Sequence, residues 1–515
     1  MVASTISPHS PKSASESEAG PLILVSNRGS IEHYVDELGR IRQREAGGGV
    51  AVALSSVAKS APVTWVAAAC SFGDQVVALT GRRVPLDNGS SLRLVSLPDE
   101  VRRPYYGVFC NPLLWFVQHS LGGELSCRDL AAEAVESWQA GYVPANRLFA
   151  DAVIAEVDRS PSGARVMLND YHLYLAPRLI RRARPHTVLQ QFIHIPWPEP
   201  SAWLRLPDRL VREICSGLLA NDSVFFQTEA ACEGFLATCR TYLGAEAEVD
   251  DRRGEVEYLG RTTSIWSNPI SVDVAELRGL AASPQVVEYG RVLEQRAGRR
   301  TIVRVDRLDP SKNVLRGFQA YEALLRRRPR LRGRVKFLAF LVPSRAGIEE
   351  YDDYARRVFA FVDEVNGRYG TKDWQPISVI YEQNRLQALA ALRLYDVLLV
   401  NSVADGMNLV SKEGPIVNGH DGVLVLSKRA GSYEELRSGA IGVDPVDVEG
   451  TARALDAALT MPPAERRRRA TLLRRAVESH ELSDWLRHQL KDLSITEYVR
   501  GVAAEPAGSR TVAIT

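Results

Sequence analysis

Short, mostly apolar runs recur along the chain, and longer segments with the periodicity of amphipathic helices separate them. Without polar alternation, runs this short predict strands that are buried on both faces. The runs form two groups of five, at residues 22–25, 63–68, 166–168, 188–193 and 224–226, and at 301–305, 337–342, 377–381, 397–400 and 423–426. Val314, Phe318, Tyr321 and Leu325 share one face of an intervening helix, with Ser311 as its expected N-cap. Strand–helix alternation of this kind predicts parallel sheets with right-handed crossovers.

The two groups of runs predict an α/β protein with two Rossmann-like, doubly wound domains that face each other across a cleft. An irregular stretch at residues 243–261 and the segment SNPISVD at 267–273 separate the groups. We therefore expect four segments: a Ser- and Pro-rich disordered tail at 1–20, a first domain at 21–271, a second domain at 272–475, and a C-terminal helix at 476–500 that packs back on the first domain.

Composition narrows the class of protein. The chain has 515 residues, of which 45% are hydrophobic and 24% charged, as in ordinary globular proteins. The net charge of +2 argues against nucleic acid or an anionic membrane as a partner. No apolar run is long enough for a transmembrane helix, the N-terminus lacks the apolar core of a secretory signal, and the six cysteines form no C-x-x-C pair. We therefore expect a cytoplasmic protein.

Cations and glycines follow several predicted strands, where ligands of doubly wound sheets bind. VSNRG places Arg28 after the first strand, and AGGG opens a helix with Gly48 and Gly49, whose backbone N–H groups could approach a phosphate. VRVDRLDPSKN places Arg307 and Lys312 beside a helix N-terminus, which suits a diphosphate. For Arg28 alone the alternative is a surface charge, and for the glycines a tight turn.

Carboxylates, imidazoles and aromatic residues follow other strands. LNDYHL puts Asp170 after one strand, and FIHIPWP puts His194 after the next, so both could reach one sugar. YYGVFCNPLLW holds Tyr106 and Trp115, which alone would indicate a buried aromatic helix. His172 and His194 lack the spacing of metal ligands, so we expect no metal.

A last turn, DGMNLVSKEG, follows the strand at 397–400. Its amides, from Gly406, Met407, Asn408 and Leu409, could bind an anion or sugar hydroxyls beside Asp405. Glu413, further along the same helix, suits the two hydroxyls of a ribose, and a helix salt bridge is the alternative for it.

Taken together, the motifs resemble those of the trehalose-6-phosphate synthase family, in the same order and from residue 22 to 493. They are SNR, the Gly-rich loop, NPLLW, DYHL, HIPWP, VDRLDxxK and DGMNLVxKE. The NPLLWFVQH wording resembles its actinobacterial branch. The resemblance implies a retaining, metal-independent hexosyltransferase of the GT-B type, with the active site between two Rossmann-like domains and no cofactor. It also implies that the leaving diphosphate takes the proton of the acceptor hydroxyl on the same face of the sugar.

The resemblance further implies residue roles. The catalytic residues would be Arg307, Lys312, His194 and Asp170. Arg307 and Lys312 would bind the donor diphosphate, together with Gly48 and Gly49. Glu413 would hold the ribose, and Asp405 and the amides of residues 406–409 would hold the donor glucose with His194. The acceptor pocket would be lined by Asp170 with Arg28, Tyr106, Trp115 and Arg345, the two arginines binding its phosphate.

Two segments depart from the family pattern. TWVAAACSFGD keeps Trp65 but has Ala68 where many members carry a second tryptophan near the acceptor. After the strand at 377–381, YEQNRLQAL replaces an aromatic-containing Q-H-F type stretch of familiar UDP-glucose users. Its Glu382 and Asn384 could accept the N1–H and N2–H₂ donors of guanine, so we expect GDP-glucose as donor, with UDP-glucose as the alternative.

We expect glucose 6-phosphate as acceptor and trehalose 6-phosphate as product, with glycerol 3-phosphate as another acceptor to test. One alternative is a pseudo-glycosyltransferase that couples a nucleotide-activated cyclitol to an amino-cyclitol phosphate, although those relatives depart from DGMNLVxKE. Another is a non-catalytic regulatory subunit that binds sugar phosphate. An Arg-rich segment at 462–493 is interpreted as a solvated helix face rather than a nucleic-acid patch. The sequence is compatible with a homo-oligomer.

Overall fold

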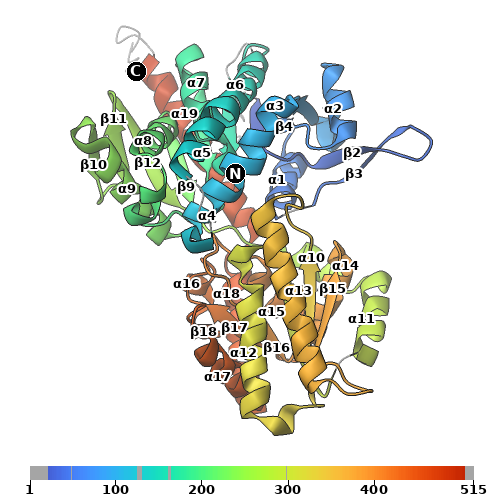
Figure 1. The fold of residues 1–515 in the computed structure, drawn as a ribbon. Helices are drawn as coiled ribbons and strands as arrows, with labels where there is room; N and C mark the ends of the chain where they lie inside the picture. The colour runs from blue at the N-terminus through green and yellow to red at the C-terminus, as the bar shows by residue number, and fades with distance from the viewer. Residues whose placement is uncertain (1–20, 48, 125–129, 161–163, 297, 505–515) are drawn as a thin grey trace, which may run out of the picture.

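A computed structural model describes residues 21–504, except residues 48, 125–129, 161–163 and 297. This part of the chain forms two lobes, each built on a largely parallel sheet with helices on both faces (Figure 1). The fold class predicted from the apolar runs is thereby confirmed. The predicted tail at 1–20 and Gly48 lie outside the described residues.

The sheet of the N-terminal lobe has the order β10-β11-β12-β9-β8-β7-β1-β4-β6-β5 in the described part of the chain. Strands β12, β9, β8, β7, β1, β4 and β6 run parallel. Antiparallel pairs extend the sheet at its two ends: β5 with β6 at one, and β11 with β12 and β10 at the other. The bounds are β1 (Leu22–Ser26), β4 (Val63–Ala68), β5 (Val84–Pro85), β6 (Ser91–Val95), β7 (Arg165–Asn169), β8 (Val188–Phe192), β9 (Ser223–Phe226), β10 (Ala247–Asp250), β11 (Glu255–Tyr258) and β12 (Arg261–Ser267).

The sheet of the C-terminal lobe is wholly parallel, in the order β15-β14-β13-β16-β17-β18. Its strands are β13 (Arg300–Arg307), β14 (Val335–Val342), β15 (Ile377–Tyr381), β16 (Val397–Val400), β17 (Val423–Ser427) and β18 (Ile441–Val443). All ten predicted runs are strands, and most of them are covered by helices on both faces, whereas the edge strand β15 is only partly buried. The predicted boundary before Val272 lies between the last strand of one sheet and the first strand of the other.

Helices cover both sheets. Those of the N-terminal lobe are α1 (Gly49–Ser60), α2 (Phe72–Leu79), α3 (Asp99–Pro104), α4 (Trp115–Gln118), α5 (Leu130–Ser137), α6 (Val143–Val157), α7 (Ala176–Ala183), α8 (Asp208–Leu218) and α9 (Glu229–Leu243), with the π-helical segments η2 (Tyr105–Leu114) and η4 (Trp138–Tyr142). The later ones are α10 (Val274–Ala281), α11 (Pro284–Arg296), α12 (Val314–Arg327), α13 (Glu349–Tyr369), α14 (Arg385–Leu394), α15 (Val410–Val417), α16 (Tyr433–Leu436), α17 (Val448–Thr460), α18 (Pro463–Glu478) and α19 (Leu482–Ala504).

Two sequence interpretations are wrong. Residues 243–261 are not irregular, because β10 and β11 form an antiparallel hairpin there. Their alternating acidic residues face solvent at a sheet edge, so the stretch lacks an apolar run. Ser311 does not cap α12 either: a 3₁₀ turn (Pro310–Lys312) intervenes, and Asn313, in a left-handed conformation with φ of 59°, precedes the helix.

An exposed hairpin of β2 (Ile31–Val35) and β3 (Ile41–Glu45) was also missed, because its strands are too polar to form an apolar run. It projects from the N-terminal lobe beside α2 (Figure 1). Asp74 of α2 anchors its base by accepting the backbone N–H of His33 and contacting the His33 ring, both at 2.8 Å.

The last helix, α19, lies against the N-terminal lobe (Figure 1). Asp492 accepts hydrogen bonds from Gln190 at 2.7 Å and Ser223 at 2.6 Å, and Trp485 packs edge-on against Phe192. The chain therefore crosses between the lobes twice, and α19 ties its end to the sheet where it began. No helix among the described residues is both long and apolar enough to cross a membrane.

Candidate active site

The predicted site residues lie at the carboxyl ends of strands, where the two lobes face each other. Asp170 and His194 follow β7 and β8 in one lobe, while Arg307 and Asp405 follow β13 and β16 in the other. The two sets lie against each other at Gly406 and His194. If Gly406 carried a Cβ atom, that atom would lie only 1.9 Å from the His194 carbonyl oxygen. The residues predicted to bind donor and acceptor therefore lie on the facing sides of the two lobes rather than on separate faces.

The two cations assigned to the donor diphosphate have different surroundings. Lys312 forms an ion pair with Asp405. Burial favours the neutral form of Asp405, but Lys312 and Asn408 outweigh it and hold the pKa of this carboxyl below its usual value. Arg307 is 42% exposed and lies over the Trp115 ring, 5.2 Å from its centroid. Arg307 is therefore the cation that remains open to a ligand.

Glu413 lies in the first turn of α15 and is half-buried. Burial raises the pKa of its carboxyl, and the nearby charge of Arg385 partly opposes this. Its side chain forms no hydrogen bond or ion pair with any described residue, so the helix salt bridge gains no support, whereas its neighbour Lys412 pairs with Glu435 at 2.6 Å. A desolvated carboxylate without a partner is well suited to accept the hydroxyls of a ribose.

The turn after β16 brings the amides of residues 406–409 to the lobe interface. Asn408 adopts a left-handed φ of 78°, and its Oδ1 accepts the backbone N–H of Ser411 at 3.1 Å, which fixes the start of α15. Its Nδ2 donates to Asp405 at 3.0 Å. Met407 is buried behind the turn, and Leu409 precedes the helix. The turn is thus held rigidly while its amides stay close to His194.

His194 is held by its own lobe. Its Nε2 donates to Asn169 Oδ1 at 3.2 Å, and its Nδ1 accepts from Gln227 Nε2 at 3.5 Å. Burial lowers the pKa of this imidazole to about 3, so the ring is neutral at physiological pH. Both ring nitrogens are thus bonded within the lobe, and the backbone carbonyl oxygen of His194 lies against Gly406.

Asp170 sits in a left-handed conformation with φ of 74° at the start of the turn after β7. Burial raises the pKa of its carboxyl to about 7, against the opposing effects of the Tyr171 and His194 backbone N–H groups and of Arg307 and Arg345. Such a carboxyl can accept or donate a hydrogen bond near neutral pH.

The other residues predicted to bind the acceptor come from both lobes. Arg28 is exposed beyond β1, and Tyr106 stacks on His172 with ring centroids 6.1 Å apart. Arg345 is buried and lies over the Trp115 ring, 4.0 Å from its centroid.

Asp309 was not among the predicted site residues, although it stands in the motif that gave Arg307 and Lys312. It is fully buried, forms an ion pair with Arg345, and accepts the indole N–H of Trp115 at 3.3 Å. Its position in VDRLDPSK, three residues before Lys312, was the available signal.

The predicted nucleobase residues lie at the start of α14. Glu382 is exposed, whereas Asn384 caps α14 by accepting the N–H of Gln387 at 3.1 Å and donates to Tyr289 at 3.2 Å. A Cβ on Gly47 would lie 2.0 Å from Gln383 Nε2, so the Gly-rich loop adjoins this segment. Gly49 begins α1, while Gly48 lies outside the described residues.

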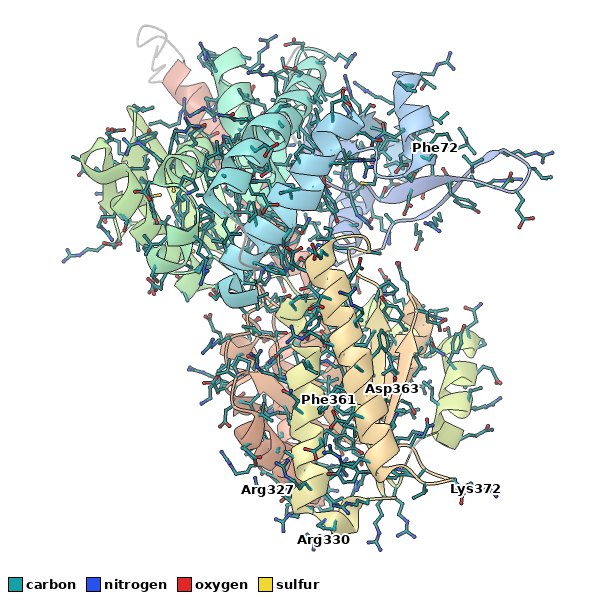
Figure 2. The ribbon with its side chains drawn as sticks, in the orientation of Figure 1. Phe72, Arg327, Arg330, Phe361, Asp363 and Lys372 are labelled. Atoms are coloured by element: carbon teal, nitrogen blue, oxygen red, sulfur yellow. The ribbon has the colours of Figure 1, made fainter. Side chains whose placement is uncertain are left out.

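Other basic residues lie away from the interface. Figure 2 shows Arg327, Arg330 and Lys372 at the end of the C-terminal lobe farthest from the N-terminal lobe. Among the described residues, no group of three or more His, Cys, Asp or Glu side chains is placed to hold a metal ion.

Cations, a carboxylate and a turn of backbone amides lie along the facing strand ends of two Rossmann-like lobes, an arrangement typical of nucleotide-sugar glycosyltransferases of the GT-B type. The chain belongs to glycosyltransferase family 20, whose model matches residues 21–495. It is accordingly a retaining glycosyltransferase of the trehalose-phosphate synthase type.

Related proteins match most of this chain. A trehalose-6-phosphate synthase of Mycolicibacterium smegmatis is 31% identical over 95% of each chain. A bifunctional trehalose-6-phosphate synthase/phosphatase of Thermoproteus tenax is 33% identical over 90% of this chain, which spans only 62% of that longer protein.

Solved structures agree with these relatives. The E. coli protein bound with UDP-2-fluoro glucose is 27% identical, with a TM-score of 0.79 over 92% of this chain and 98% of that one. An α,α-trehalose-phosphate synthase (UDP-forming) of Burkholderia xenovorans, in complex with glucose 6-phosphate, is 28% identical, with a TM-score of 0.79 over 92% of this chain and all of that one.

Proposed function

We propose that this protein is an α,α-trehalose-6-phosphate synthase, which transfers glucose with retention from a nucleoside-diphosphate-glucose to glucose 6-phosphate. The proposal rests on one observation: two arginine side chains, one from each predicted substrate site, lie over the same tryptophan ring. Arg307, assigned to the donor diphosphate, and Arg345, assigned to the acceptor phosphate, both lie over Trp115. The two phosphorylated substrates would thus be brought together at the lobe interface.

The geometry suits a reaction driven by position and charge. Arg307, open to solvent, would stabilise the departing diphosphate, and Lys312 would remain tied to Asp405 beside the donor glucose. The two-carboxylate mechanism of retaining glycosidases needs carboxyl groups about 5 Å apart. On the family mechanism, the leaving diphosphate instead accepts the proton of the attacking acceptor hydroxyl on the same face. Asp170 would bind an acceptor hydroxyl.

For the donor we propose GDP-glucose, with UDP-glucose as the second candidate. Glu382 supports guanine, because its exposed carboxylate at the start of α14 can accept the N1–H and N2–H₂ donors. UDP-glucose is supported by the names of relatives, such as the UDP-forming enzyme of Schizosaccharomyces pombe, 31% identical over 90% of this chain. Five described cysteines are free thiols, which suits the expected cytoplasmic location.

A donor-by-acceptor activity matrix tests the function. Initial rates with UDP-, GDP- and ADP-glucose are measured against glucose 6-phosphate and glycerol 3-phosphate, with and without EDTA. We expect turnover with glucose 6-phosphate, highest with GDP-glucose and insensitive to EDTA. Tight glucose 6-phosphate binding without turnover would instead support a regulatory subunit, and turnover only with an activated cyclitol would support a pseudo-glycosyltransferase.

A substitution at Glu382 tests the preference for the nucleobase of the donor. Glu382→Ala should lower the rate with GDP-glucose more than the rate with UDP-glucose. Asp363→Asn, on α13 and well away from the interface (Figure 2), is the matched loss of an exposed carboxylate and should change neither. A strict preference of the wild type for UDP-glucose would reject the guanine assignment.

A further inference from the structure

The buried carboxylate of Asp309 lies at the point where the two lobes touch. Its Oδ1 accepts the backbone N–H of Ser311 at 2.9 Å and the Ser311 hydroxyl at 2.8 Å, so the turn before α12 fixes it. The same oxygen accepts the indole N–H of Trp115 at 3.3 Å, from the opposite lobe. A residue of the donor lobe therefore orients an aromatic ring of the acceptor lobe.

The other oxygen, Oδ2, faces two arginines. It forms an ion pair with Arg345, and Arg307 lies 4.0 Å away. Arg345 also donates to the Tyr351 hydroxyl at 3.0 Å and, across the lobe interface, to the Tyr171 hydroxyl at 3.4 Å. Its guanidinium is thus held on three sides.

One buried nitrogen of Arg345 makes no hydrogen bond within the described part of the chain. This atom is its Nε. A buried donor without a partner is costly, and such atoms are expected where a ligand completes the bonding. An anionic oxygen of the acceptor phosphate would supply the missing acceptor at this atom.

Asp309 is itself a buried charge, fully removed from solvent. A buried carboxylate is tolerated only when it is paired and hydrogen-bonded, and replacing it leaves its partners uncompensated. Here the partners are the two side chains, Arg345 and Trp115, that the acceptor pocket needs in fixed positions.

We propose that Asp309 is a positioning residue for the acceptor: it holds Arg345 and the Trp115 indole in the geometry that receives the acceptor's phosphate, and it does so only when the two lobes are together. The identity of the acceptor rests on the proposed function. The donor side is held by a different set, Lys312 with Asp405 and Asn408. Arg307 is 42% exposed and lies 4.0 Å from Asp309, at the limit of an ion pair, so solvent screening leaves Asp309 little influence on donor binding.

The test separates acceptor affinity from donor affinity. Asp309→Asn should raise the KM for glucose 6-phosphate by about tenfold or more, since a charge-assisted contact to Arg345 is lost. The Kd of the nucleoside diphosphate, measured by calorimetry, should change less than about twofold because the donor contacts remain. Asp309→Glu, which keeps the charge, should restore part of the acceptor affinity.

A double-mutant cycle with Trp115→Phe tests whether the two residues act as a unit. This change keeps the ring but removes the N–H, so it should raise the acceptor KM, and the double variant should fall short of the product of the single effects. The matched control is Glu156→Gln, a buried carboxylate of α6 paired with Arg83 and Arg93, which should lower thermal stability without moving the acceptor KM.

Each outcome is decisive. An unchanged acceptor KM in Asp309→Asn, or an equal loss of donor and acceptor affinity, would overturn the proposal. If Asp309→Asn fails to fold, Trp115→Phe alone decides, because an unchanged acceptor KM there would overturn it as well. Wild-type enzyme that does not turn over glucose 6-phosphate would defeat the proposed function instead, and so the two failures are distinguishable.

Discussion

Gly406 offers the sharpest test of the contact between the lobes. A methyl group on this residue would lie 1.9 Å from the carbonyl oxygen of His194 and 2.9 Å from its carbonyl carbon. Ordinary van der Waals contact begins at 3.4 Å, so the methyl intrudes by about 1.5 Å. The obstructing atoms are backbone and cannot rotate away. In Gly406→Ala, either the turn of residues 406–409 or the opposite lobe must therefore move.

A displacement of this size is large for catalysis. Misplacing reacting groups by about 1 Å can cost about a hundredfold in rate. We therefore expect Gly406→Ala to lower kcat/KM by about a hundredfold or more. The φ of Gly406 is not in the left-handed region, so backbone strain does not contribute to this loss.

The assay is steady-state kinetics with the preferred donor and glucose 6-phosphate, alongside thermal unfolding. Gly290→Ala is the matched control, because a Cβ at this position in α11 would meet nothing within 4 Å. It should leave kcat/KM unchanged. A folded Gly406→Ala enzyme that keeps half of the wild-type kcat/KM would refute the close approach of the lobes at the donor site.

Three further predictions concern individual charges. Arg307→Ala should lower kcat by about a hundredfold to a thousandfold, because it removes a group that stabilises developing charge. Near-normal turnover would show that Arg307 does not have this role. Glu413→Gln should weaken nucleoside diphosphate binding about tenfold in calorimetry while leaving the acceptor KM unchanged, and an unaltered Kd would exclude a ribose contact. Asp170 has a folded-state pKa raised by burial to about 7, so wild-type stability falls as pH rises from its unfolded pKa of 3.8 through 7. Asp170→Asn should lose activity yet gain about 3 kcal/mol of stability relative to wild type between pH 5 and pH 8, and equal pH profiles of unfolding would contradict the burial of its charge.

The sequence predicted the strands well because most of their residues are apolar and most of the strands are covered on both faces. β1 and β17, for example, are buried at every position. The β2–β3 and β10–β11 hairpins escaped notice because their strands lie at edges or in solvent, where side chains need not be apolar. The apolar face of α12 was predictable, but its start was not, since Ser311 lies inside a turn held by Asp309 that precedes the helix.

The candidate site could be located from residues after strand ends, but the pairing of those residues could not. Lys312 and Asp405 are 93 positions apart, and Trp115 and Asp309 are 194 apart, so only the fold brings each pair together. Periodicity also could not show that both ring nitrogens of His194 are already bonded or that Glu413 lacks a partner among the described residues. Those properties depend on packing from several elements at once.

The most direct measurement of the central claim is proton NMR of the product formed from nucleoside-diphosphate-glucose and glucose 6-phosphate. If one cleft holds both substrates and transfers glucose on a single face, the spectrum must show a non-reducing disaccharide monophosphate with α configuration at both anomeric centres. A β-linked product, a reducing disaccharide, or free glucose with no disaccharide phosphate would contradict it.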